Sequence, residues 1–212
     1  MASKVKSDGV RAASPVDPIK DLDKVVEIAT KLKETNPRNC AIFVMGINVG
    51  LRAGDLLDLK LSDVLDGDKF RNAVVIVEEK TGKRRDFTLN AAAKAALDYY
   101  LASSMAPRAI EGEETYLFPS RVGTNQPLSV KALHKLVNKW CLEAKLTGNF
   151  GTHTLRKTFA YHLYTKHIAS NPRILDVLQM ILGHSSTTVT LRYIGVTAQE
   201  IDGIYSGLNL GI

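Results

Sequence analysis

The sequence predicts a mainly α-helical domain of the α+β class that carries one small three-stranded antiparallel sheet. Apolar residues recur at helical spacing along most of the chain, whereas residues 72–89 are rich in β-branched residues and alternate. At 212 residues, with 45% hydrophobic and 24% charged positions, the chain is long enough for one domain with a sizeable core. We therefore expect one compact helical domain.

The first third of the chain predicts three helices. Asp17 followed by Pro18 is a helix-start signal. The apolar positions that then recur at helical spacing are Leu22, Val25, Val26, Ala29 and Leu32. Residues 39–50 are almost entirely apolar and predict a central helix that ends at Gly50, and a short helix is expected within residues 53–64.

The pattern then changes to that of strands and returns to that of helices. Residues 72–79 and 85–89 predict two antiparallel strands joined by a tight turn, and a third strand is expected near residues 61–64. Later helices are expected within residues 91–103, 130–146, 153–167 and 173–182, and TAQE at residues 197–200 is a capping box for a last helix.

Charge favours a nucleic-acid partner. Twenty-eight Lys and Arg against 22 Asp and Glu give a net charge of +6, which favours a polyanion, although many basic proteins bind none. Cys40 and Cys141 lie far apart, so neither a disulfide framework nor a zinc ribbon is indicated and a reducing cytoplasm is the default. The N-terminus lacks the apolar segment of a signal peptide, and no stretch is long enough to span a membrane, so no membrane role is expected.

Several basic residues are spaced so that they can bind one anion. His153 and Arg156 lie three apart and share a helix face. Arg52 follows a helix and a glycine, and Asp55 can hold it in place. The predicted hairpin turn carries Lys80, followed by Lys83, Arg84 and Arg85 as candidate DNA contacts. Each feature alone also fits an ordinary ion pair or a solvated turn.

The sequence offers no evident metal site, and no cofactor is expected. Asp63, Asp66 and Asp68 lie in one turn but lack the later glutamate of a calcium loop. The histidines outside the candidate set show no zinc-ligand spacing. A nucleophile must then come from a side chain.

Tyr193 is the strongest candidate for that nucleophile. It lies in LGHSSTTVTLRYIG, nine residues after His184, whereas most other tyrosines fit amphipathic helices. A phenol is only about one part in a thousand ionised at pH 7, and we expect two arginines at a bound phosphate to lower its pKa. Tyrosine forms covalent intermediates in catalysis.

Taken together, these residues resemble the catalytic domain of the tyrosine recombinases, the phage integrase family. The match extends over residues 17–206 and keeps the family's order and local context. The residues that carry it are Arg52 in GLRAGDLL, Lys80 in KTGKRR, His153 and Arg156 in HTLR, His184 in LGHSS and Tyr193 in TLRYIGV.

The resemblance implies a role for each residue. Arg52, His153 and Arg156 bind the scissile phosphate, and His184 donates a further hydrogen bond to it. Tyr193 attacks phosphorus to give a 3′-phosphotyrosyl link, and Lys80 protonates the departing 5′ oxygen. Asp55 supports the arginine from the position where the family usually has Glu or Asp. The implied substrate is double-stranded DNA, and neither metal nor cofactor is implied.

The sequence also departs from the family pattern. Lys157 stands where a histidine commonly follows the second arginine, and we expect it to alter contacts with DNA more than chemistry. Residues 1–16 read as a flexible basic arm and residues 17–212 as the catalytic domain, without the separate N-terminal DNA-binding domain usual in the family. The resemblance implies that the tail, residues 197–212, docks on a neighbouring protomer within a DNA-bound homotetramer; the alternative is a last helix that packs onto its own domain.

Two other functions remain open from the sequence. A type IB topoisomerase shares much of this residue set, but the small size and the LGHSS context argue against it. A catalytically silent DNA-binding homologue has no need of the nucleophile that this chain retains. The sequence specifies neither the DNA site nor whether the outcome is integration, excision, inversion or resolution.

Overall fold

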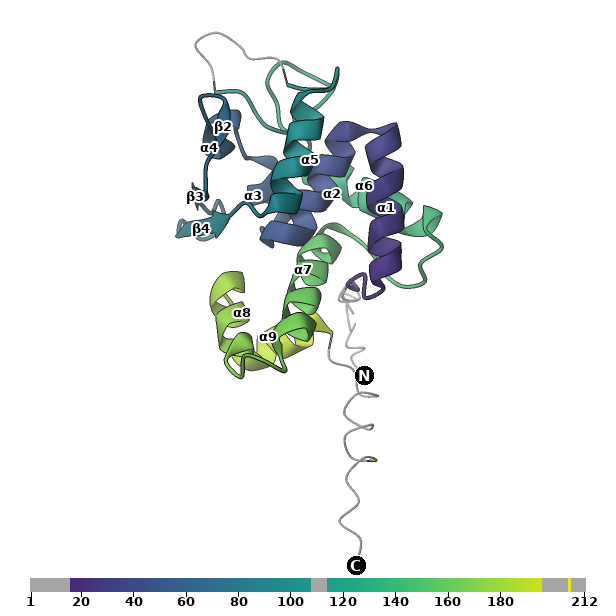
Figure 1. Cartoon of the computed structure of the whole chain (residues 1–212), viewed down its shortest axis with the longest axis vertical. Coiled ribbons are helices and arrows are strands. Elements are labelled where there is room, and N and C mark those ends of the chain that lie inside the picture. Colours follow the sequence, from purple (N-terminus) through teal and green to yellow (C-terminus); the bar gives the residue numbers. More distant parts are fainter. Residues whose placement is uncertain (1–15, 108–113, 196–205, 207–212) are drawn as a thin grey trace, which may run out of the picture.

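The computed structural model describes residues 16–107, 114–195 and 206, and over these residues the chain is mostly helical with small antiparallel sheets (Figure 1). This confirms the predicted fold class. The helices are α1 (Leu22–Thr35), α2 (Pro37–Val49), α3 (Ala53–Leu57), α4 (Leu61–Val64), α5 (Ala91–Leu101), α6 (Val130–Glu143), α7 (Thr152–His167), α8 (Ile174–Leu182) and α9 (Thr187–Ile194). The strands are β1 (Leu65–Asp66), β2 (Lys69–Phe70), β3 (Ala73–Val77) and β4 (Arg84–Thr88).

The central helix is α2, as the apolar run predicted. It packs against α1, α5 and α7, and most of its residues are buried (Figure 1). Asn36 caps it by accepting from the amide of Asn39, and Pro37 occupies its first turn, where a missing N–H costs nothing. The helix ends at Gly50, which has the left-handed φ of 60°.

Helix α1 starts later than the sequence indicated. The Asp17–Pro18 signal does not open a helix; Asp21 caps α1 instead, accepting from the amides of Asp23 and Lys24. Asp17 instead contacts the segment just before α7, where its carboxylate accepts a hydrogen bond from the amide of Asn149. The segment before α1 therefore ties the N-terminal part of the described chain to the region of the candidate site.

The predicted three-stranded sheet is wrong in detail. Strands β3 and β4 pair antiparallel, from Ala73↔Thr88 to Val77↔Arg84, as expected. The third strand is replaced by α4, which is stabilised when Asp63 accepts from the amide of Lys60 at 2.7 Å. The chain then forms a separate two-stranded pair, β1 with β2, so the described residues contain two two-stranded sheets.

Two apolar clusters form the interior. The larger one is centred on α2 and includes residues of α1, α5 and α6. The smaller one is built from α7, α8 and α9, with Ala160, Leu178 and Ile194 among its buried residues. Figure 1 shows α8 and α9 below the main body, with α7 leading to them. Helix α7 therefore connects the two clusters.

The expectations for both termini lie outside the described residues. These are the flexible arm, of which residues 1–15 are not described, and the capping box and tail at residues 197–212. Among the residues that are described, no helix is long and apolar enough to cross a membrane.

Alanine substitutions at Gly50 and Gly67 distinguish two costs to stability: the strain of a left-handed backbone and the overpacking caused by an added methyl group. Both have φ of 60°, but a methyl group at Gly50 overlaps the ring of Phe159, whereas one at Gly67 meets nothing within 4 Å. We expect Gly67→Ala to lower the free energy of unfolding by about 1–2 kcal/mol. Gly50→Ala should cost a further 1–3 kcal/mol or so. Urea unfolding followed by circular dichroism measures both, and equal losses would contradict the predicted close approach of α2 and α7.

Candidate active site

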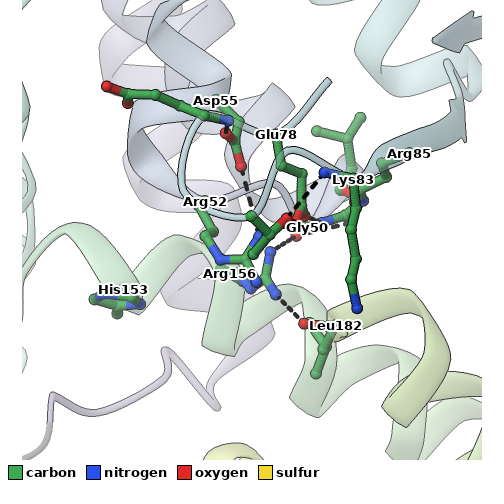
Figure 2. Close-up of polar contacts among 12 residues, drawn as sticks. Gly50, Arg52, Asp55, Glu78, Lys83, Arg85, His153, Arg156 and Leu182 are labelled. Atoms are coloured by element: carbon green, nitrogen blue, oxygen red, sulfur yellow. Dashed lines mark hydrogen bonds and ion pairs between the residues drawn. The ribbon is translucent and has the colours of Figure 1, made fainter. Parts of the chain in front are cut away.

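Arg156 is the buried centre of the candidate site. It lies on α7 and is 3% exposed. Its guanidinium donates to the carbonyl of Gly50 at 2.9 Å and to that of Leu182 at 2.5 Å (Figure 2). These carbonyls belong to the C-terminal ends of α2 and α8, where helical carbonyls lack intrahelical partners and carry partial negative charge. Two helix ends therefore hold the guanidinium.

Burial lowers the pKa of Arg156 to about 10. The positive charges of Arg85 and Arg52 act in the same direction, whereas Tyr193 and Glu78 oppose them. The guanidinium is still charged at neutral pH, because a pKa of about 10 lies well above 7. Arg156 is therefore a fixed positive charge.

Arg52 supplies a second guanidinium nearby and is more accessible. It precedes α3, and its side chain is 23% exposed. Its Nη1 forms an ion pair with Glu78 Oε2 at 2.5 Å and lies 3.9 Å from Asp55 Oδ2 (Figure 2). Asp55 Oδ1 accepts from the amide of Glu79 at 3.1 Å. Asp55 therefore lies beside Arg52, and Glu78 is the nearer carboxylate partner.

Glu78 was not identified from the sequence. Its carboxylate contacts Arg52 with one oxygen and Arg85 Nη1 with the other, at 3.5 Å, and it accepts from the hydroxyl of Thr81 at 2.7 Å. Burial disfavours its ionised form, but these contacts outweigh burial and hold its pKa at about 2. The alternation along β3 could have indicated that Glu78 is buried, because Glu78 falls on the same inward face as Val74 and Ile76.

Of the candidate DNA contacts on the hairpin, Arg85 points inward. Its Nη2 donates to the carbonyls of Val49 and Gly50 at 3.3 and 3.0 Å, and burial lowers its pKa. These contacts fit a structural role and do not support the predicted contact with DNA. Lys83 and Arg84 are exposed, as such contacts require, although Arg84 also pairs with Asp86 at 3.2 Å.

Lys80 forms no hydrogen bond or ion pair with the other predicted catalytic residues in the described part of the chain. It lies on the exposed turn between β3 and β4. Within the described residues its side chain makes no hydrogen bond or ion pair, and it reaches the site only electrostatically, by helping to lower the pKa of His153. Its position therefore depends on the backbone of the turn.

Tyr193 lies on α9 between two histidines. Its hydroxyl is 3.4 Å from His153 Nδ1, and its ring centroid is 4.8 Å from that of His184. Lys157 lies on α7 with its Nζ 5.2 Å from the centre of the same ring. Lys157 is buried, and its ammonium lies over the ring of Tyr193, the candidate nucleophile. This position does not support the predicted contact of Lys157 with DNA.

In the protein alone, Arg156 and Arg52 act to lower the pKa of Tyr193, as expected, but burial has the larger effect. Burial raises this pKa, and the opposing effects of Arg156 and Arg52 are too weak to reverse it. Tyr193 is therefore a neutral phenol in the unbound site.

The two histidines are also held neutral. Burial lowers the pKa of His153 and of His184, and Arg156 and Arg52 lower both further. His184 Nδ1 lies 3.1 Å from the hydroxyl of Thr190, which fixes the orientation of the ring. The site therefore combines charged guanidiniums with neutral imidazoles. In the part of the chain that is described, no group of three or more His, Cys, Asp or Glu is placed to hold a metal ion.

Comparison with known sequences identifies relatives. The chain matches the Phage integrase family over residues 19–200. Probable integrase/recombinase YoeC of Bacillus subtilis (strain 168) is 35% identical over 198 residues, which are 91% of this chain and 98% of that protein. Tyrosine recombinase XerC of Thermodesulfovibrio yellowstonii is 30% identical over 190 residues, 88% of this chain and 60% of XerC. The chain thus spans nearly all of the first relative but only about three fifths of the second.

The solved structures with a similar fold include a recombinase and the catalytic domain of an integrase. A crystal structure of XerA recombinase matches 92% of this chain and 64% of its own, with a TM-score of 0.68 and 22% identity. The catalytic domain of bacteriophage HP1 integrase matches 92% of this chain and 97% of its own, with a TM-score of 0.57 and 19% identity. At these identities the likeness concerns the fold.

Lys157 provides a test of the electrostatics at Tyr193. Its charge lowers the pKa of His153 but is not among the causes of the shift at His184. In an NMR titration, both imidazoles should titrate below the ordinary value of about 6.5. Lys157→Met keeps an apolar stem and removes the charge, so it should raise the pKa of His153 and leave that of His184 unchanged. Equal shifts at both histidines would mean that the variant rearranges the whole site.

Proposed function

The chain belongs to the phage integrase family, and we propose that it is a site-specific DNA recombinase that cleaves and rejoins DNA through a 3′-phosphotyrosyl intermediate on Tyr193. One observation carries this proposal: the hydroxyl of Tyr193 lies 3.4 Å from His153 and within the electrostatic field of Arg156 and Arg52. A nucleophile beside fixed guanidiniums is suited to attack on a phosphodiester.

The proposed phosphate ligands are Arg52, His153, Arg156 and His184. Arg156 is held rigidly by two carbonyls, so it stabilises charge on the phosphoryl oxygens without reorganising. Arg52 is more exposed than Arg156, and it pairs with Glu78 through Nη1. The rest of its guanidinium remains accessible to a DNA phosphate.

The proposed reaction is a transesterification. The phenolic oxygen of Tyr193 forms a bond to phosphorus, and the bond between phosphorus and the 5′ oxygen breaks. His153 Nδ1 is close enough to take the phenolic proton, and its lowered pKa leaves it neutral for that purpose. Lys80 gives a proton to the 5′ oxygen, which requires the turn between β3 and β4 to bring its ammonium to the leaving group.

The proposed substrate is double-stranded DNA. One structure of similar fold is that of XerH site-specific recombinase bound to palindromic difH substrate, with 22% identity and a TM-score of 0.68 over 92% of this chain and 54% of its own. We propose that Lys83 and Arg84 bind DNA phosphates, because they are exposed on the turn that carries Lys80.

We also propose that residues 17–212 act as the catalytic domain within a homotetramer on DNA. Residues 197–212 then dock on a neighbouring protomer and couple cleavage between subunits. A tetramer in solution on a mapped DNA site, lost when residues 197–212 are deleted, is the result that this arrangement requires.

The chemistry is tested by trapping the covalent adduct. Duplexes tiled from the DNA that flanks the gene are incubated with the protein and denatured in SDS, and the protein–DNA adduct is resolved on a gel. We expect the wild-type protein to give an adduct with a small subset of duplexes. Tyr193→Phe should give none while retaining DNA binding in a mobility-shift assay, because only the nucleophilic oxygen is removed.

Tyr164→Phe is the matched control, since Tyr164 packs in the smaller apolar cluster, and it should form the adduct normally. An adduct that persists in Tyr193→Phe would overturn the mechanism. Relaxation of any supercoiled plasmid, regardless of sequence, would indicate a topoisomerase. Sequence-specific binding by the wild-type protein without any adduct would indicate a silent DNA-binding homologue.

A further inference from the structure

We infer that Glu78 is a positioning residue that holds the turn carrying Lys80 in register with the phosphate-binding arginines. This inference rests on the proposed function, because it concerns the delivery of the general acid. Glu78 is 7% exposed and directly follows β3, at the point where the hairpin leaves the body of the protein. Its side chain does not reach the reacting atoms through any contact of its own.

The backbone of Glu78 closes the turn. Its amide donates to the carbonyl of Lys83 at 2.9 Å, and its carbonyl accepts from the amide of Gly82 at 2.8 Å. The hydroxyl of Thr81 donates to Glu78 Oε2 at 2.7 Å, so the side chain of Glu78 also joins the two ends of the turn. Lys80 lies inside this small closed unit, and its place follows from that of Glu78.

The carboxylate of Glu78 then ties this unit to the site. Oε2 pairs with Arg52 at 2.5 Å, and Oε1 lies 3.5 Å from Arg85. Arg85 donates to the carbonyl of Gly50 at 3.0 Å, and this same carbonyl accepts from Arg156 at 2.9 Å. Glu78 is thus connected directly to Arg52 and, through Arg85 and the carbonyl of Gly50, to Arg156, which are the two arginines among the proposed phosphate ligands.

A purely structural ion pair would make the same contacts. The experiment must therefore separate a defect in positioning Lys80 from a loss of stability or of phosphate binding. A DNA substrate with sulfur in place of the 5′ oxygen at the scissile phosphate provides this distinction. A thiol has a pKa of about 8.5 and departs as a thiolate without an acid. A defect confined to Lys80 therefore slows cleavage of the oxygen substrate and spares the sulfur substrate.

The experiment compares Glu78→Gln with the wild-type full chain on two duplexes of one mapped site, which differ only in that oxygen or sulfur. We expect the rate of adduct formation on the oxygen substrate to fall by about 10²-fold, the loss that misplacing a catalytic group by about 1 Å causes. The rate on the sulfur substrate should stay within about threefold. Lys80→Ala should give the same selective pattern with a loss of about 10²–10⁴-fold on oxygen.

Glu79→Gln is the matched control, because Glu79 is the adjacent glutamate, is exposed and contributes its backbone amide to Asp55. It should leave both rates unchanged. If Glu78→Gln does not fold, Thr81→Val decides the matter: Thr81 is exposed, and losing its hydroxyl loosens the turn without removing a charge. It should slow only the oxygen substrate, by a smaller factor than Glu78→Gln.

Equal losses on both substrates, or no loss on either, would overturn the role of Glu78 and leave the proposed recombinase chemistry intact. Failure of the wild-type protein to form an adduct with either substrate would instead refute the proposed function. The two failures are therefore distinguishable in one set of reactions.

Discussion

The burial of one guanidinium, that of Arg156, organises both the fold and the site. A buried charge without partners is strongly destabilising, and here the carbonyls at the ends of α2 and α8 provide the partners. Those helices belong to different apolar clusters, so the same two hydrogen bonds link the end of α8 to the main core, in addition to the packing of α8 and α9 on α7. Because α9 packs on α7 and α8 and carries Tyr193, the residue that would hold the phosphate lies on, and is bonded to, the helices that support the candidate nucleophile.

The charge balance around Arg156 adds to the effect of burial on the protonation states. Arg52, Arg85 and Arg156 face two buried carboxylates, Glu78 and Asp55, which leaves an excess of positive charge. Burial is the main cause of the lowered pKa of the two histidines, and this excess acts in the same direction. The excess is also available to an anion. The pKa of about 2 for Glu78 means that protonation does not release Arg52 near neutral pH, so a DNA phosphate must share this arginine with Glu78.

The sequence predicted the features that depend on local pattern. Helical spacing and β-branched alternation were enough for the helical fold and the hairpin. The order of the six motif residues made Tyr193 the candidate nucleophile, and the structure places its hydroxyl 3.4 Å from His153. It failed where tertiary contacts decide. Residues 61–64 form a helix because Asp63 caps its start, and Arg85 turns inward because the carbonyls of α2 lie beneath the hairpin. Alternation shows which residues of a strand share a face, but the partners that this face meets come from the rest of the fold.

The raised pKa of Tyr193 constrains how the proposed attack proceeds. Burial keeps the phenol neutral despite Arg156 and Arg52, and a bound phosphate would cancel part of their positive field. A phenolate formed before substrate binding is therefore disfavoured, and the proton must leave as the bond to phosphorus forms. His153 satisfies both requirements for accepting it, since it lies 3.4 Å away and is kept neutral by burial and by the same arginines. In this arrangement burial keeps His153 able to accept the proton, and the arginines act in the same direction without ionising Tyr193.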